Sequence, residues 1–427
     1  AVPNASPTPA APAEPAPPPV AAPLAPPAPV STAEAPPFTL GLRASAYLQG
    51  QYQYNQLSED ELQAGGAPLN QNRFLVRRGR VRFDRDWDYA AGSLELDANT
   101  VSGSAIGIRR AEASLVYRGS EPSSDTPPLV VLTAGVTDIP FGFDLLQSAR
   151  VRPFMERSLA SNALFPSEAD AGVKLSGAIA FFRYGVAVMN GEPLDDQGFP
   201  SDPNSAKDLI GRVGVDVTPA DGFSLWGGTS FAKGKGFHPG RDARKRSIAW
   251  RDTDENGTLQ PGAELQGIPA TAASPSKNFD RWALGLDLGA SFTTPLGLSK
   301  LYAEAFLASN YDRGLVSADP VESVSGDLRH AGAYVALEQG ITDWGIAGFR
   351  AGFYDPNSDV LESRQGRQLP LSQTITTLSP LVGFVLKGRA KLLIQYDFVR
   401  DHLGRDASGK PTDAENDGFT ARLQVEL

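Results

Sequence analysis

Hydrophobic and polar side chains alternate along most of the chain from Phe38 onward. In residues 40–54 one face carries Leu40, Leu42, Ala44, Ala46, Leu48 and Tyr52. Because successive side chains of a β-strand point to opposite faces, this pattern predicts a long strand with one polar face. Residues 417–427 repeat the pattern at the C-terminus. The alternation extends further than any helical period in the sequence, so we predict an all-β fold.

The same alternation recurs in many segments, most of which are long. Strands in soluble proteins usually have about five or six residues, whereas a tilted strand needs about 9–11 residues to cross a membrane. We therefore predict membrane-spanning strands at 39–54, 72–85, 87–98, 105–118, 129–138, 170–182, 183–192, 206–218, 222–233, 279–292, 298–310, 327–340, 343–355, 373–386, 388–400 and 417–427.

The links between these strands differ in length according to their order. Long links follow the odd-numbered strands, for example 55–71, 139–169 and 234–278, whereas short turns such as 219–222 follow the even-numbered ones. Outer-membrane barrels have this asymmetry, with short periplasmic turns and long extracellular loops. The sequence predicts a transmembrane antiparallel β-barrel of about 16 strands over residues 38–427, with both termini in the periplasm.

Residues 1–37 differ from the rest of the chain, because 26 of these 37 positions are Pro or Ala. Such a segment cannot bury a core, and its prolines favour an extended polyproline II conformation. We predict a disordered periplasmic leader, which is either a passive spacer or a tether to a periplasmic partner. Ala1 begins without the basic and apolar regions of a signal peptide, so we expect the signal peptide to be absent from this chain.

The composition excludes several classes of protein. The chain has no Cys, which excludes disulfide frameworks and thiolate metal sites. Its net charge is −10 and no basic domain stands out, so we expect no nucleic-acid partner. The three histidines, His238, His330 and His402, lie in separate segments with no Ser or Asp motif around them. We therefore expect no enzyme activity.

The second predicted strand carries the densest basic run of the sequence. Alternation directs Arg78, Arg80 and Arg82 into the lumen. Val81 then faces lipid, and so does Arg77 unless a bulge intervenes. A barrel of about 16 strands is wide enough for an aqueous channel, so these arginines are candidates for lining it.

The third long loop, 139–169, is the candidate for a constriction if it folds inward. Its arginines Arg150, Arg152 and Arg157, with Arg110 from the fourth strand, complete the set of candidate anion-binding residues. Guanidinium groups fit phosphate and carboxylate oxygens and stay charged at any relevant pH. A ring of them at a constriction favours anions.

The charges predicted for the lumen as a whole argue against an anion preference. Alternation places ten basic and ten acidic side chains on the predicted lumen face, so the wall is balanced. Charges in such a wall often pair across strands and leave little selectivity. The sequence therefore leaves anion preference and weak selectivity both open, and a preference requires local segregation of charge.

Several motifs resemble those of one known family. They are Arg77-Arg78-Gly79-Arg80-Val81-Arg82-Phe83, Leu94-Glu95-Leu96-Asp97, residues 134–142, Phe154-Met155-Glu156-Arg157-Ser158-Leu159, Met189-Asn190-Gly191 and residues 211–219. The chain resembles the phosphate-selective porin family of Gram-negative outer membranes. The resemblance covers roughly residues 39–427 and is dense in residues 73–220.

The resemblance implies a sixteen-stranded barrel, a homotrimer, a third loop folded into the pore and an arginine-lined eyelet for phosphate or other anions. Arg77 and Arg78 match the arginine pair in the second strand of the family. The chain departs from the family pattern in having no visible lysine cluster and in ending at Leu427 rather than at an aromatic residue. The missing lysine cluster favours a broader channel over phosphate specificity.

The loop 234–278 contains a partial calcium-binding pattern. Asp252, Asp254 and Asn256 occupy side-chain ligand positions, and Thr258 occupies a carbonyl ligand position. Glu264 follows at position thirteen of the motif rather than twelve. The segment is either a Ca²⁺ site that orders the loop or a solvated acidic turn.

Together these patterns predict an outer-membrane porin for passive diffusion of small hydrophilic solutes, with a preference for anions such as phosphate. We expect contacts with outer-membrane lipid and lipopolysaccharide, because the predicted barrel faces lipid and basic residues precede the calcium-like segment. The alternatives for these basic residues are that they collect anions at the channel mouth or only keep the loop soluble. The alternative is a barrel that serves as a structural or surface anchor, whose leader and calcium-like loop bind partners. Channel conductance separates the two.

Overall fold

The computed structural model describes most of the predicted barrel. The described residues are 41–56, 71–119, 127–192, 202–251, 256–323, 326–359, 361–364, 367–370, 373–386, 389–402, 412–414 and 416–427. The predicted leader, residues 1–37, lies outside them.

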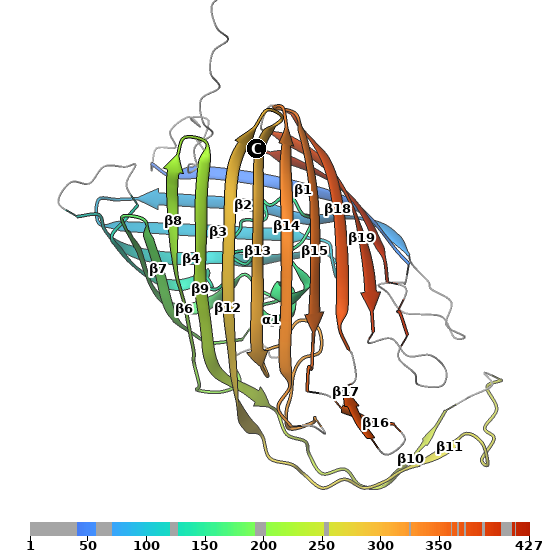
Figure 1. The fold of residues 1–427 in the computed structure, drawn as a ribbon. Helices are drawn as coiled ribbons and strands as arrows, with labels where there is room; N and C mark the ends of the chain where they lie inside the picture. Colours follow the sequence, from blue (N-terminus) through green and yellow to red (C-terminus); the bar gives the residue numbers. More distant parts are fainter. Residues whose placement is uncertain are drawn as a thin grey trace, which may run out of the picture.

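Among the described residues, sixteen strands form one closed antiparallel barrel (Figure 1). Neighbouring strands of this wall follow one another along the chain. The last of them, β20 (Gly418–Glu426), pairs with the first, β1 (Arg43–Asn55), and this closes the barrel. The other wall strands are β2 (Asn72–Asp86), β3 (Ala90–Asn99), β4 (Ala105–Tyr117), β5 (Val130–Asp138), β6 (Ala169–Ile179), β7 (Phe182–Met189), β8 (Asp208–Ala220), β9 (Phe223–His238), β12 (Lys277–Thr294), β13 (Gly297–Ser309), β14 (Arg329–Ile341), β15 (Gly345–Asp355), β18 (Ile375–Leu386) and β19 (Ala390–Asp401). The predicted fold is confirmed.

The strand pleat separates an apolar outer surface from a buried inner one. In β14, Val335 and Leu337 are 46% and 45% exposed, whereas Ala336 and Glu338 between and after them are 1% and 6% exposed. A water-soluble protein does not expose such a row, but a bilayer solvates it. The alternation read from the sequence is thus the division between lipid and lumen.

The long links gather at one end of the barrel and the short turns at the other (Figure 1). Gly222, in the short turn between β8 and β9, has φ +72°, a conformation that favours glycine. Beyond the rim of the long-loop end lies the hairpin β10 (Ser247–Trp250) and β11 (Leu265–Ile268) (Figure 1).

A second small hairpin, β16 (Leu361–Arg364) and β17 (Arg367–Pro370), lies in another long link. All four of these short strands lie in segments predicted as loops, because four residues give too short a run of alternation to indicate a strand.

The described wall has three register shifts; one lies between Val217 and Ala220 of β8, and the other two are β-bulges that carry an arginine. In the β1–β2 register Gln49 pairs with Arg78 and Gly50 with Val76, so Arg77 is the extra residue. In the β3–β4 register Arg109 is extra in the same way. A bulge shifts the side-chain alternation by one residue, so both members of an adjacent arginine pair can face the lumen. Arg77 therefore faces the lumen, as predicted for the case in which a bulge intervenes, and not lipid as strict alternation alone requires.

The third long loop, which joins β5 to β6, folds into the barrel and fills part of it. Phe141, Phe154 and Phe165 of this loop are each 1% exposed and belong to a core that includes wall residues such as Tyr334. The loop contains the short helix α1 (Leu159–Leu164), whose Ser158 cap accepts a hydrogen bond from Ser161 N. The hydrophobic core therefore lies between this loop and the inner wall.

The helices of the described residues include none with the length and apolar character to span a bilayer.

Candidate anion site in the barrel lumen

Loop three, residues 139–168, is fixed to opposite sides of the inner wall. On one side Gly142 N donates to Ser230 Oγ of β9 at 2.9 Å. On another side Met155 N donates to Gln395 Oε1 of β19 at 3.0 Å. Because the loop bonds to strands far apart in the barrel wall, it crosses the lumen and narrows it. This is the inward fold that the family resemblance implied.

The tip of this crossing carries Glu156, whose carboxylate lies among three arginines. Arg78 forms a two-pronged contact with it, at 3.0 Å to Oε1 and 2.7 Å to Oε2. Arg77 Nε and Arg422 donate to Oε1 at 2.8 and 2.7 Å. We call Arg77, Arg78 and Arg422 the guanidinium nest. Three positive charges surround one carboxylate there, which leaves two positive charges in excess.

Other polar groups hold the nest in position. Arg422 donates from Nε and a terminal nitrogen to Gln51 Oε1 at 2.8 and 2.6 Å, and to Met155 O at 2.7 Å. Arg78 also donates to Gln49 Oε1 at 3.4 Å. Gln51 and Arg422 are direct cross-strand neighbours of β1 and β20, so the wall itself sets their geometry.

Arg350 of β15 adds a further positive charge close to this point. It donates to the backbone oxygen of Glu156 at 2.9 Å, and its guanidinium lies 4.7 Å from the centre of the Phe154 ring. The ring contact stabilises the cation by a cation–π interaction. Arg350 therefore increases the positive potential around Glu156 without binding its carboxylate.

A second cluster, around Glu168 at the end of loop three, differs in its balance of charge. Glu168 accepts from Arg109 at 2.9 Å, from Arg80 at 3.3 Å and from Arg152 at 3.5 Å. We call these four residues the Glu168 cluster. Its arginines also have other carboxylate partners on the wall and the loop, namely Glu95, Asp97, Asp138 and Asp144. Three arginines thus face five carboxylates, so this cluster has no excess of positive charge, and it ties loop three to β2 and β4.

Solvent access separates the two clusters as well. In the guanidinium nest the side chains of Arg77 and Glu156 are 27% and 31% exposed, whereas Arg78 and Arg422 are buried. In the Glu168 cluster the side chains of Arg152 and Glu168 are 1% and 8% exposed. The nest therefore reaches lumen water through Arg77 and Glu156, whereas the Glu168 cluster is buried.

Glu156 and Glu168 of loop three are held in the charged form. Burial alone would raise the pKa of Glu156, but Arg78, Arg77 and Arg422 outweigh it and lower the pKa well below its usual value. Arg109, Arg80 and Arg152 do the same for the pKa of Glu168.

The arginines proposed from the sequence do not form a single ring. Arg77, Arg78, Arg80 and Arg152 join the two clusters. The other four bind elsewhere: Arg82 to Asp84 at 2.8 Å, Arg110 to Asp138, Arg150 to Glu426, and Arg157 to the backbone oxygens of Phe165 and Pro166 at 2.7 and 2.8 Å. Burial lowers the pKa of Arg157 to about 10. Arg157 therefore braces the loop rather than lining the water-filled space.

Sequence reasoning missed four residues of these clusters: Arg109, Arg422, Glu156 and Glu168. Arg109 falls on the lipid face by strict alternation, and only the bulge directs it inward. The signal was available, because Arg77-Arg78 and Arg109-Arg110 are both adjacent arginine pairs in strands. Two neighbouring charges in a membrane strand indicate a bulge, since neither side chain belongs in lipid.

The calcium-like segment is only partly described, because Asp252 and Asp254 lie outside the described residues. Asn256 Oδ1 accepts from Thr258 N at 2.7 Å. Glu264 Oε2 accepts from the Trp250 indole at 3.0 Å and belongs to a buried side chain. Calcium binding stays a prediction.

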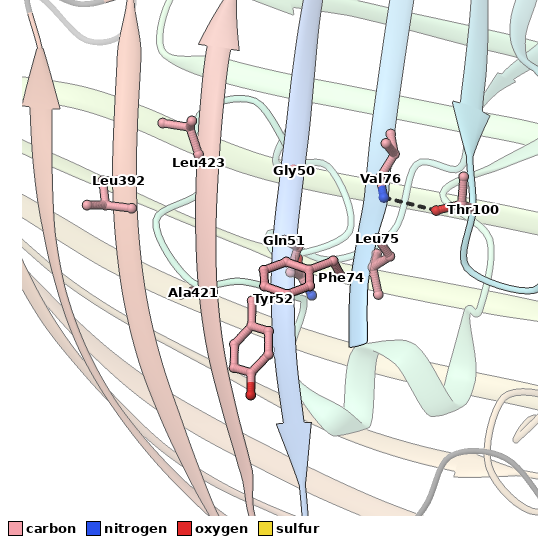
Figure 2. Close-up of a pocket in the computed structure, with 10 residues that line it drawn as sticks. All are labelled: Gly50, Gln51, Tyr52, Phe74, Leu75, Val76, Thr100, Leu392, Ala421 and Leu423. Carbon is pink, nitrogen blue, oxygen red and sulfur yellow. Dashed lines mark hydrogen bonds between the residues drawn. The ribbon is translucent and has the colours of Figure 1, made fainter. Parts of the chain in front are cut away.

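The outer wall also carries a groove of about 590 Å³ beside Gly50, shown in Figure 2. Phe74, which is 84% exposed, and Tyr52 border it, and a Cβ added to Gly50 would meet nothing within 4 Å. The groove opens on the lipid-facing surface of β1, β2, β19 and β20.

No protein-family model matches the sequence, and no curated protein sequence does. Solved structures do share its fold. The outer membrane channel DcaP of Acinetobacter baumannii matches with a TM-score of 0.54 at 11% identity, over 90% of this chain and 97% of that one. An anion-selective porin from Comamonas acidovorans matches with a TM-score of 0.52 at 13% identity, over 90% and 99%. This is the fold of an outer-membrane porin. The fold and the exposed apolar surface place the chain in the outer membrane of a Gram-negative bacterium.

Proposed function

We propose that the chain is a channel for passive diffusion of small hydrophilic solutes across the outer membrane, with a preference for anions such as phosphate. The observation that carries the proposal is the guanidinium nest at the point where loop three crosses the lumen. It combines an excess of positive charge with access to water. A positive constriction attracts anions and repels cations, and low local dielectric strengthens both effects.

The balanced charges elsewhere in the barrel do not oppose this preference. Ion pairs such as Arg212 with Asp287, at 2.6 Å, compensate each other and contribute little net potential. Selectivity is set where the path is narrowest, so a local excess outweighs a balanced wall. We also propose that the protein is a homotrimer without enzyme activity, and that its outer surface contacts lipid and lipopolysaccharide.

Planar-bilayer recording of the purified protein in a salt gradient tests the proposal. We expect stable channels, a reversal potential that favours anions, and inhibition of the chloride current by added phosphate. Open channels with no ion preference would contradict the anion preference and leave a general porin. Absence of conductance from a correctly folded barrel would instead favour the structural anchor.

A further inference from the structure

We propose that the guanidinium nest is a binding site for the carboxylate groups of permeating solutes, and that the Glu156 side chain occupies this site as a tethered competitor. The inference rests on the proposed channel function and deepens it, because it names the class of anion that the lumen binds. It is carried by the way in which Glu156 is held.

The nest binds a carboxylate in the manner expected of a specific site. The Arg78 fork meets both oxygens of Glu156, and Arg77 and Arg422 converge on Oε1. Paired guanidinium nitrogens fit the two coplanar oxygens of a carboxylate. Glu156 therefore reports the chemistry that the nest accepts, since its own side chain is the ligand in this structure.

Two of the three nest arginines have supports other than the Glu156 carboxylate. Arg422 has two hydrogen bonds to Gln51 Oε1 and one to Met155 O, none of which involves the Glu156 side chain. Gln49 likewise supports Arg78. A preorganised site needs little reordering to bind a second carboxylate.

A solute carboxylate can replace the Glu156 carboxylate in the nest. Its excess of two positive charges lets a solute carboxylate approach while Glu156 is still bound. The Glu156 side chain, 31% exposed, can then turn into lumen water, where its charge is solvated. The Glu168 cluster has neither property, because its carboxylate is buried and its arginines are shared with four other acidic residues.

A tethered competitor explains how such a site can serve a channel. Three arginines on one free solute would hold it tightly, whereas transport requires binding that is weak enough for release. A competitor on the same chain acts at a high effective concentration, in the millimolar range or above, and so lowers the apparent affinity for free carboxylates.

The experiment compares the wild-type protein with Glu156→Gln and Glu156→Ala, using acetate as the probe. Block of the chloride current by acetate measures its affinity in the channel. Broadening of the ¹³C-acetate NMR signal by the detergent-solubilised protein measures binding without conductance. The matched control is Glu338→Gln, which removes the same charge from an inner-wall residue that bonds to Tyr302 rather than to the nest.

Both Glu156 variants are expected to bind acetate more tightly, on the order of tenfold, because the tethered competitor is gone. Glu338→Gln is expected to leave acetate affinity near the wild-type value. Unchanged acetate affinity in both Glu156 variants, or an equal gain in the control, overturns the inference. So does a larger gain for phosphate than for acetate. If the wild-type channel shows no anion preference, the proposed function fails, while NMR still decides whether the nest binds carboxylates.

Discussion

At the scale of single residues, the adjacent arginines of β2 and β4 decide the character of the lumen. Each pair puts two guanidinium groups on the same side of its strand, because Arg77 and Arg109 are bulge residues. Alternation alone would direct only Arg78 into the lumen here, and the bulge directs Arg77 there as well. Because of this one extra residue, two adjacent arginines rather than one contact Glu156.

The low pKa of Glu156 leads to a pH prediction. A carboxyl whose folded pKa is lowered stays charged as the pH falls through the usual glutamate value of 4.5. The difference in anion selectivity between wild type and Glu156→Gln should therefore be the same at pH 4.5 as at pH 7. Reversal potentials at both values measure it, and carboxyls that titrate in both proteins cancel in the comparison. A difference that disappears by pH 4.5 would show that Glu156 titrates normally.

At the scale of elements, loop three behaves as an internal layer anchored by the Glu168 cluster. Its aromatic side chains pack against the inner wall, and Arg80 and Arg109 reach it from β2 and β4. Two kinds of contact hold the loop inside the barrel. Its apolar side chains pack against the inner wall, and its charged side chains fix the position of the loop relative to β2 and β4.

Glu168→Ala should loosen this loop while the barrel persists. Arg80 and Arg109 would keep their wall carboxylates and Arg152 would keep Asp144, so the variant loses the ion pairs that join loop three to the wall. Removal of one partner from a buried ionic cluster costs up to about 3–5 kcal/mol. We expect faster amide hydrogen exchange in residues 139–168 and unchanged exchange in strands β12 to β15. Glu338→Gln serves again as the control. Equal protection of the loop in Glu168→Ala and wild type would mean that packing alone holds it.

At the scale of the whole molecule, most of the barrel follows from the sequence, and the arrangement of its interior does not. Long alternating segments predict strands because each residue has a defined environment, lipid or lumen. Bulges break that rule at one position, so strict alternation gives the wrong face for Arg77 and for Arg109, although Arg77 is among the predicted lumen residues. The partners of the arginines were not predictable either, since Glu156 and Arg422 are 266 residues apart and meet only when the loop crosses the closed barrel.

The central claim is that the guanidinium nest gives the channel its anion preference. The most direct test is the reversal potential in a salt gradient of Arg77→Gln/Arg78→Gln, beside wild type and the control Arg244→Gln/Lys245→Gln. The control removes the same charge from exposed residues of the long extracellular link. We predict that the nest variant loses its anion preference and that the control keeps it. A nest variant that remains as anion-selective as wild type would contradict the account.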